Sequence, residues 1–277
     1  MASTVDYAEI VHRALEEDVG QGDATSAWTL PAGLAGRGVF LCKASGILAG
    51  IEVAREVFRQ VSPEIRLDAR RRDGDAIEPG DELATVQGPM AAILTAERTA
   101  LNFLQRMSGI ATATRRYVQA VAGTRAVILD TRKTVPGLRV LDKWAVRLGG
   151  GSNHRMRLDD MVLIKDNHIA AAGGITAAVR GVRAGDPHKL PIEVEVKTWA
   201  ELEEAVALLP DRIMLDNMDC DQMRRAVDWV AGRVPLEASG GIQLESARAV
   251  AETGVDYISV GALTHSVVAL DISLEVE

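Results

Sequence analysis

The sequence predicts an α/β protein whose second half is a closed or nearly closed β/α barrel. From about residue 127 onward, short apolar runs alternate with helical patterns, and the pair occurs six times. This order predicts parallel strands joined by right-handed crossovers. The later strands begin near residues 192, 212, 235 and 257, which leaves room for little besides strand, loop and helix. An open doubly wound sheet is the alternative, but no GxGxxG follows the first strand, so a dinucleotide-binding domain has no support.

The first half, residues 1–110, is predicted to be a mixed α+β domain. Apolar residues three and four apart indicate helices, and Gly, Pro and Asp at short intervals indicate antiparallel strands with tight turns. Gly109 is a candidate break in the last helix. The expected elements, in chain order, are a helix over 6–17, a strand over 36–45, a helix over 50–61, strands within 71–88 and a long helix over 91–122.

Residues 111–267 are predicted to form the barrel domain. Each apolar run is followed by a candidate helix, and the clearest helices are 199–209, 221–232 and 244–254. No low-complexity linker separates the two domains. The six expected strands are 126–130, 161–166, 192–196, 212–216, 235–241 and 257–262.

Composition restricts the functional class. The 277 residues are 47% hydrophobic and 25% charged, as in an ordinary globular protein. A net charge of −8 argues against nonspecific nucleic-acid binding, which needs an extended basic face. No apolar run reaches membrane-spanning length, and the polar start MASTVDYAEI is unlike a signal or transit peptide. Cys42 and Cys220 lack metal or redox spacing. These features predict a cytoplasmic enzyme or binding protein without nucleic-acid or membrane partners.

A cationic segment lies in the middle of this acidic chain. Residues 130–168 hold eight Lys or Arg against five Asp, and glycines, His154 and His168 interrupt them. Such a segment favours a small ligand with several carboxylates or phosphates over a plain solvated helix. The basic residues are Arg132, Lys133, Arg139, Lys143, Arg147, Arg155, Arg157 and Lys165.

Polar residues follow nearly every expected strand. In β/α barrels the active site lies at the C-terminal ends of the strands, because the βα loops converge there. One charged residue leaving a strand is usually only solvated, but six strand ends of this kind favour a binding site. They carry Asp130–Lys133, Lys165–Asp166, Glu195–Lys197, Asp216–Asn217, Ser239–Gly241 and Gly261.

The last two strand ends carry a phosphate-binding signal. Residues 238–246 and 259–266 each run from a strand through glycine into a helix. Glycine lets the backbone approach an anion, and free N–H groups at a helix start bind it. Glycine is also ordinary at such turns, so each loop alone is weak evidence, and the two together favour phosphate.

Two carboxylates and two histidines are further candidates. Glu195 and Asp216 follow successive strands and are candidate partners for Mg²⁺ or ribose. Glu193 shares a strand face with Glu195, so one of the two could be a structural ion-pair partner. His154 and His168 lack a zinc-ligand spacing. His154 is interpreted as a donor to an anionic ligand, and His168 equally well as a structural histidine.

Eight motifs of the chain are together specific enough to indicate a protein family. ERTALNFLQRMSGIAT, DTRKTVPGLR, GGGSNHR, LIKDNHI, EVEV, IMLDNM, EASGGI and GVDYISVGALTHS occur in this order. Together they resemble the quinolinate phosphoribosyltransferase family over nearly the whole chain. The resemblance implies an N-terminal open-faced sandwich domain and an incomplete, seven-stranded α/β barrel, with the tail 268–277 returning to the first domain. The seventh strand would lie near residues 151–154.

The resemblance also implies substrates and residue roles. The substrates would be quinolinate and 5-phosphoribosyl-1-pyrophosphate (PRPP) with Mg²⁺, in a homodimer whose Arg98 acts in trans. The products would be nicotinate mononucleotide, pyrophosphate and CO₂. Quinolinate would contact Arg98, Arg132, His154, Arg155 and Lys165. PRPP would contact Lys133, Glu195, Asp216 and Asn217, with Mg²⁺ at Glu195 and Asp216. The 5′-phosphate would contact Ser239, Gly240, Gly241, Val260, Gly261 and Ala262.

One residue role and three alternative functions stay open. The chain after NHR reads MRLDD where the family more often has glycine, so the role of Arg157 is open. ModD-like paralogues that act on another anionic substrate share the resemblance. From the residues alone, a barrel lyase with Lys165 as Schiff base and a non-catalytic phosphosugar-binding protein are the rivals.

Overall fold

The computed structural model describes residues 7–277 and divides into two compact units. Of the described residues, unit 1 comprises 7–115, 134–150 and 263–277, and unit 2 comprises 116–133 and 151–262. The predicted domain boundary at 110/111 falls inside one helix, α4. Met1–Asp6, part of the polar start used against a signal peptide, lies outside the described residues.

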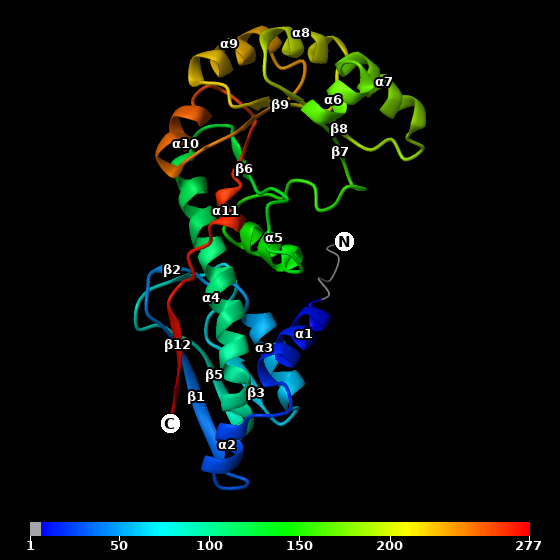
Figure 1. Cartoon of the computed structure of the whole chain (residues 1–277). Helices are drawn as coiled ribbons and strands as arrows, with labels where there is room; N and C mark the ends of the chain where they lie inside the picture. Colours follow the sequence, from blue (N-terminus) through cyan, green and yellow to red (C-terminus); the bar gives the residue numbers. More distant parts are fainter. Residues whose placement is uncertain (1–6) are drawn as a thin grey trace. The chain divides into compact units, whose positions relative to one another are not determined.

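Unit 1 is built on a four-stranded antiparallel sheet, in the order β12-β1-β5-β3 (Figure 1). The aromatic pair Phe40 and Phe58, with ring centroids 5.9 Å apart, joins a strand and a helix of this unit through its core. The α+β organisation predicted for the first half is confirmed. Its elements are α1 (Ala8–Val19), α2 (Ala24–Thr29), β1 (Ala35–Cys42), β2 (Gly46–Ile47), α3 (Ile51–Val61), β3 (Arg66–Ala69), β4 (Ala76–Ile77), β5 (Glu82–Pro89), α4 (Met90–Ala120, which runs into unit 2), α5 (Arg139–Leu148) and β12 (Ile272–Val276).

The candidate break at Gly109 is wrong, because α4 is continuous over 31 residues. Glycine is needed there for a different reason. A Cβ at Gly109 would collide with the backbone oxygen of Val268, which passes directly against the helix. The chain then continues into β12, which pairs antiparallel with β1, so its C-terminal segment lies in unit 1.

Unit 2 contains a six-stranded parallel sheet in the order β6-β11-β10-β9-β8-β7, with helices α6 to α10 along its outer side (Figure 1). All six strands predicted from the sequence are present. The elements are β6 (Val127–Leu129), β7 (Val162–Ile164), α6 (Asp166–Ala172), α7 (Ile175–Gly185), β8 (Ile192–Val196), α8 (Trp199–Ala207), β9 (Arg212–Asp216), α9 (Cys220–Val230), β10 (Leu236–Ser239), α10 (Leu244–Ala251), β11 (Tyr257–Ser259) and α11 (Ala262–His265, at the boundary with unit 1).

The seventh strand is not formed as a strand. Ser152 makes an isolated parallel bridge to Leu129 on β6, where the sequence placed that strand. The structure therefore supports the α/β barrel class with six strands and one bridged residue, and the count of seven is not confirmed. Within residues 7–277, no helix is both long and apolar enough to cross a membrane.

The two faces of the parallel sheet differ in chemistry. Side chains alternate along each strand, so paired residues share a face. One face carries Val, Ile, Leu and Ala, such as Val194, Ile213 and Leu215, all 0% exposed. The opposite face is polar, although a barrel interior is usually filled by apolar side chains. Its members include Glu193, Glu195, Arg212, Asp216, Glu237, Ser239 and Ser259.

Candidate active site

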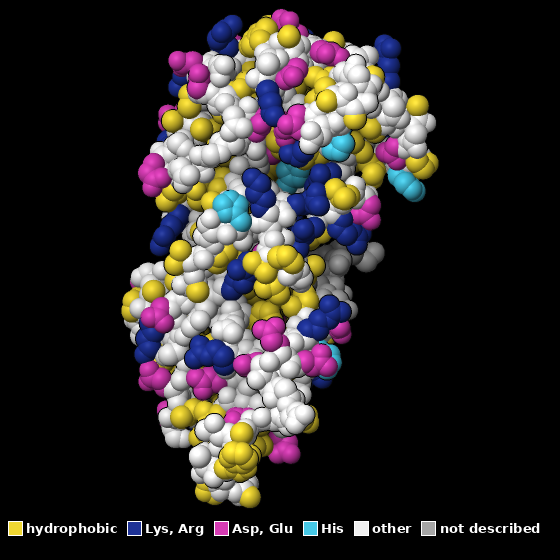
Figure 2. Space-filling view, viewed as in Figure 1, with side chains coloured by type: hydrophobic (Ala, Val, Ile, Leu, Met, Phe, Trp, Pro, Cys, Tyr) yellow, Lys and Arg dark blue, Asp and Glu magenta, His cyan; other side chains and the backbone are white. Residues whose placement is uncertain are grey.

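The parallel strands bring most of the predicted site residues to one end of the sheet in unit 2. Because every strand runs the same way, residues that follow the strands collect at their C-terminal ends. Figure 2 shows Lys and Arg side chains gathered, with histidine, on the side of unit 2 where β6 and β7 lie. The predicted residues of this end are Arg132 and Lys133 after β6, His154 and Arg155 after the Ser152 bridge, Lys165 after β7, Glu195 on β8, Asp216 and Asn217 at β9, Ser239, Gly240 and Gly241 at β10, and Val260, Gly261 and Ala262 after β11.

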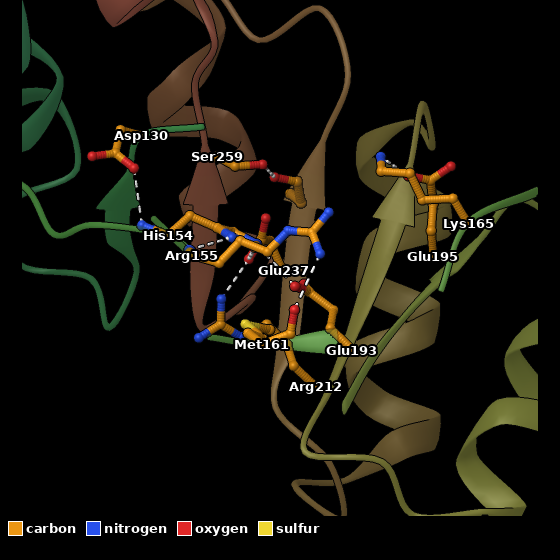
Figure 3. Close-up of polar contacts among 11 residues, drawn as sticks. Asp130, His154, Arg155, Met161, Lys165, Glu193, Glu195, Arg212, Glu237 and Ser259 are labelled. Atoms are coloured by element: carbon orange, nitrogen blue, oxygen red, sulfur yellow. Dashed lines mark hydrogen bonds and ion pairs between the residues drawn. The ribbon is translucent and has the colours of Figure 1, made fainter. Parts of the chain in front are cut away.

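His154 is buried, and its ring reaches the polar face of β8 and β10 (Figure 3). Its Nε2 is 2.9 Å from Glu193 Oε2 and 3.7 Å from Glu237 Oε2. Its Nδ1 accepts a hydrogen bond from the Arg155 backbone N–H at 2.7 Å. Both ring nitrogens therefore have partners within the protein.

Asp130 fixes the loop on the other side of His154. This carboxylate is 0% exposed and accepts the His154 backbone N–H at 2.9 Å and the Asn153 amide at 2.5 Å. From the sequence, Asp130 is predicted only as one of several charged residues at strand ends. The signal was present in the chain, because a carboxylate directly after a buried strand needs donors, and the nearby GGGSN segment could supply them.

Glu193 and Glu237 form a buried carboxyl pair beneath His154. Both are 0% exposed, and Arg212 Nη1 donates to Glu237 Oε2 at 2.7 Å. Burial raises the pKa of each carboxyl to about 7, and for Glu237 the negative charge of Glu193 raises the pKa further. The Oε1 atom of Glu193 and the Oε1 atom of Glu237 have no hydrogen-bond partner. The pair therefore holds protons at a pH where an exposed glutamate would be ionised.

This pair should make the protein less stable as the pH rises. Each carboxyl has a pKa of about 7 when folded against 4.5 as its ordinary value, so the folded protein binds protons that the unfolded chain releases. The stabilisation is complete below 4.5 and is lost as the pH rises through 7. Glu237→Gln removes one titrating group. We therefore expect the free energy of unfolding in urea to fall less steeply in this variant between about pH 5 and pH 8. Equal slopes in variant and wild type would contradict the prediction.

Arg155 and Arg132 place two cations close together. Burial lowers the pKa of Arg155, and the positive charge of Arg132 lowers it further. Arg155 Nη1 donates to the backbone oxygen of Met161 at 3.1 Å, which holds the guanidinium in place. Two guanidinium groups that repel each other are stabilised by an anion placed between them, and each can bind a carboxylate bidentately.

Lys165 and Glu195 form an ion pair across the ends of β7 and β8. Lys165 Nζ is 2.5 Å from Glu195 Oε2, and the glutamate is buried while the lysine is partly exposed. Lys197 Nζ donates to Asp166 Oδ2 at 2.7 Å, and this contact raises the pKa of Lys197, with smaller effects from Asp216 and Glu195. The strand ends thus alternate cations with carboxylates.

The glycine turn after β10 has two different glycines. A Cβ at Gly240, where φ is +105°, would collide with the Asn217 side chain. A Cβ at Gly241, where φ is +59°, would meet nothing within 4 Å. Asn217 itself has a left-handed φ of +55°, and its backbone N–H donates to Ser239 at 2.9 Å. Only Gly241 therefore borders open space.

Two other predicted site residues, Val260 and Arg98, lie in different surroundings from the charged side chains described above. The Val260 backbone N–H donates to Leu129 at 2.9 Å, so it is already used within the sheet. Arg98 lies on α4 in unit 1 and is exposed.

Comparison with known protein families decides the relationship. The family model described as quinolinate phosphoribosyl transferase, N-terminal domain, matches residues 23–108. The corresponding C-terminal domain model matches residues 110–275. The chain belongs to the quinolinate phosphoribosyltransferase family. The resemblance found in the sequence motifs is confirmed.

Family members of known name are similar over nearly the full chain. The Mycobacterium leprae (strain TN) protein named nicotinate-nucleotide pyrophosphorylase (carboxylating) is 49% identical over 273 residues, covering 96% of both chains. The Nicotiana tabacum protein named quinolinate phosphoribosyltransferase (decarboxylating) 1b is 46% identical, covering 99% of this chain and 83% of its own length. The crystal structure of NadC from Streptococcus pyogenes has a TM-score of 0.95 and 39% identity, covering 100% of this chain and 98% of that one.

Two residues whose roles were open in this family member have structural partners. Arg157, in the MRLDD departure from the usual family motif, is exposed and pairs with Asp159 at 3.0 Å. Asp160 accepts the backbone N–H groups of Met156 and Arg157, which closes the turn. His168 Nδ1 accepts the Lys165 backbone N–H at 3.0 Å and so caps α6.

Proposed function

We propose that this protein transfers the phosphoribosyl group of PRPP to quinolinate and decarboxylates the product, giving nicotinate mononucleotide, pyrophosphate and CO₂. The observation that carries the proposal is the group of cations Arg132, Arg155 and Lys165, which follow β6, the Ser152 bridge and β7 at the same end of the sheet. Quinolinate has two adjacent carboxylates, and adjacent fixed cations match them. Family membership supports the same reaction.

The proposed roles follow the chemistry of the two substrates. Quinolinate binds Arg132, His154, Arg155 and Lys165 of one subunit. Arg98 of the partner subunit completes this set. Its ring nitrogen attacks the anomeric carbon, and pyrophosphate leaves towards Lys133. The transition state has oxocarbenium character, which the carboxylates of Glu195 and Asp216 stabilise electrostatically. Loss of the adjacent carboxylate as CO₂ then leaves its electron pair on the ring carbon, where the positive charge of the pyridinium nitrogen stabilises it, and a proton taken up from water at that carbon completes nicotinate mononucleotide.

No amine nucleophile is needed for this reaction. Lys165 Nζ is 2.5 Å from Glu195 Oε2 and is engaged in an ion pair with this buried side chain. A Schiff base requires a free amine, so the ion pair argues against the lyase alternative. The side chains act chiefly by positioning the substrates and by balancing charge.

Glu195 and Asp216 would hold Mg²⁺ with PRPP. They lie on the same face of adjacent strands, since Glu195 pairs with Met214 and Asp216 follows two residues later. Mg²⁺ in phosphate sites typically takes one or two carboxylates and completes its shell with water and phosphate oxygens, so this donor set fits. When bound, the ion would screen the pyrophosphate charge. Asn217 lies beside Asp216 and would contact the ribose or pyrophosphate.

The 5′-phosphate would bind at the turns of residues 239–241 and 260–262. We predict that Gly241→Asn raises KM for PRPP about tenfold or more, because Asn tolerates a left-handed backbone and its amide would occupy the open space there. KM for quinolinate should change little. Gly232→Asn is the matched control, since Gly232 has a φ of +74° with nothing within 4 Å of its Cβ and lies after α9, away from the strand ends. A change in KM for quinolinate alone would contradict the phosphate assignment.

The assembly and location complete the proposal. A symmetric homodimer would bring Arg98 of one subunit to the site of the other. The cytoplasmic location expected from the sequence stays a prediction.

The test of the function is a comparison of two acids. With PRPP and Mg²⁺, the purified protein should release CO₂ from quinolinate and form nicotinate mononucleotide. Nicotinate lacks one carboxylate and would leave one of the partly buried cations at the site unpaired, which costs binding free energy. Its kcat/KM should therefore be lower by orders of magnitude. Comparable values for both acids would refute the assignment, and no activity with quinolinate would favour a ModD-like paralogue.

A further inference from the structure

The ring of His154 is held by two hydrogen bonds that select one tautomer. Nδ1 accepts the Arg155 N–H, so this nitrogen carries a lone pair. A neutral imidazole carries one N–H, so the proton is on Nε2, which lies 2.9 Å from Glu193 Oε2. In the opposite tautomer, the Nδ1–H group would face the backbone N–H of Arg155, and this contact would be repulsive.

The position of Glu193 in the sheet keeps its side chain next to His154. The residue lies on β8 with 0% exposure and pairs in register with Arg212 on β9. Glu237 Oε2 is 3.7 Å from the imidazole and already accepts from Arg212, so Glu193 is the closer acceptor (Figure 3). The ligand atoms of His154, Glu193 and Glu237 lie within 4.8 Å of one another, which would suit a metal ion. The guanidinium of Arg212 already pairs with Glu237 Oε2 at 2.7 Å, which argues against a cation there.

We propose that Glu193 is a positioning residue for quinolinate binding: it fixes His154 as the Nε2–H tautomer, and His154 in turn fixes the backbone N–H of Arg155. The proposal rests on the proposed function only for the role of Arg155 in binding quinolinate.

The position of Arg155 follows from two opposed anchors. Asp130 holds the His154 backbone N–H from the β6 side, and Glu193 holds the imidazole from the β8 side. The Arg155 backbone is bonded to that imidazole, and its guanidinium is bonded to Met161. Loss of the Glu193 acceptor frees the ring to turn, and the Arg155 guanidinium then loses its fixed distance to the substrate carboxylate. Misplacement of a charged donor weakens binding of that substrate specifically.

The test compares two variants of Glu193. Glu193→Leu removes the acceptor, and we expect KM for quinolinate to rise about tenfold, as for the loss of one hydrogen bond to a charged group, with KM for PRPP changed by less than about twofold. Glu193→Gln keeps an acceptor of the same shape and should restore KM for quinolinate to within about threefold of wild type. Nitrogen-15 NMR of labelled histidine, with His154 assigned by His154→Asn, should report Nε2–H in wild type and Glu193→Gln and a mixture of tautomers in Glu193→Leu.

Each result bears on the proposal. An Nδ1–H tautomer in the wild type overturns it, as does an unchanged KM for quinolinate in Glu193→Leu. Equal losses for both substrates in Glu193→Leu and Glu193→Gln indicate a structural role only and overturn it too. Failure of the proposed function is distinguishable, because the wild type would then not use quinolinate, while the tautomer measured by NMR would be unaffected.

Discussion

Replacing Arg155 by alanine is expected to lower kcat/KM for quinolinate about a thousandfold. Truncating one partner of a buried charge pair typically costs 2–5 kcal/mol, and every 1.4 kcal/mol is a factor of ten. Arg155 is partly buried beside Arg132, so a substrate carboxylate bound there is shielded from water. Steady-state kinetics at saturating PRPP measure the effect, which should appear chiefly in KM for quinolinate.

Arg157→Ala is the matched control for this substitution. Arg157 is two residues away and carries the same charge, but its side chain is 73% exposed and pairs with Asp159. An exposed ion pair contributes about 1 kcal/mol or less, so we expect kinetics within about twofold of wild type. If both variants lose activity equally, net charge near the site and not the geometry of Arg155 determines quinolinate binding.

The parallel sheet could be predicted from the sequence because its strands carry a strong local signal. Runs such as IEVEV and RIMLD are short, apolar and separated by clear helices, and they became β8 and β9 with the expected bounds. Gly109 shows the limit of local rules. Its glycine suggested a helix break, but the physical cause is the close passage of Val268, some 160 residues away in the chain. A contact of that sequence separation leaves no local pattern.

The positive charges of the candidate site could be predicted from the sequence, but the hydrogen-bond partners of its side chains could not. Basic residues after strands pointed to anion binding, and the strand ends do carry Arg132, Arg155 and Lys165 at one end of the sheet. From the sequence, we predict that His154 donates a hydrogen bond to the ligand. In the structure, its two ring nitrogens bond to Glu193 and Arg155. Side-chain pairing across strands depends on register, and register is set by the whole sheet. The ligand contacts predicted for these residues stay predictions.

Glycine positions show the same limit at the phosphate loop. Gly240 and Gly241 are adjacent and look equivalent in the sequence. In the structure a Cβ at the first meets Asn217, and a Cβ at the second points into open space. A substitution at Gly240 would therefore disturb a neighbouring side chain before it reached any ligand. Only the second position tests anion binding cleanly.

Arg98→Ala and Lys165→Ala homodimers are each expected to be nearly inactive, and mixing them should restore activity to about a quarter of wild type. The reason is the symmetry of the proposed dimer, in which each site combines Lys165 of one subunit with Arg98 of the other. Random pairing makes half of the dimers hybrids. Each hybrid has one site with both residues intact and one site with neither. Co-expression with two different affinity tags, followed by tandem purification, isolates these hybrids for assay.

The arrangement of the substitutions separates action in trans from action in cis. If Arg98 served the site of its own subunit, every site in a hybrid would lack one residue, and no activity would return. Purified hybrids should instead reach about half of wild-type activity, since one of their two sites is complete. The exposed position of Arg98 on α4 argues against a folding defect as the cause of inactivity, and thermal unfolding of each homodimer checks this. Hybrids that form but stay inactive would refute the shared site, and Arg98 would then act within its own subunit or only in the structure.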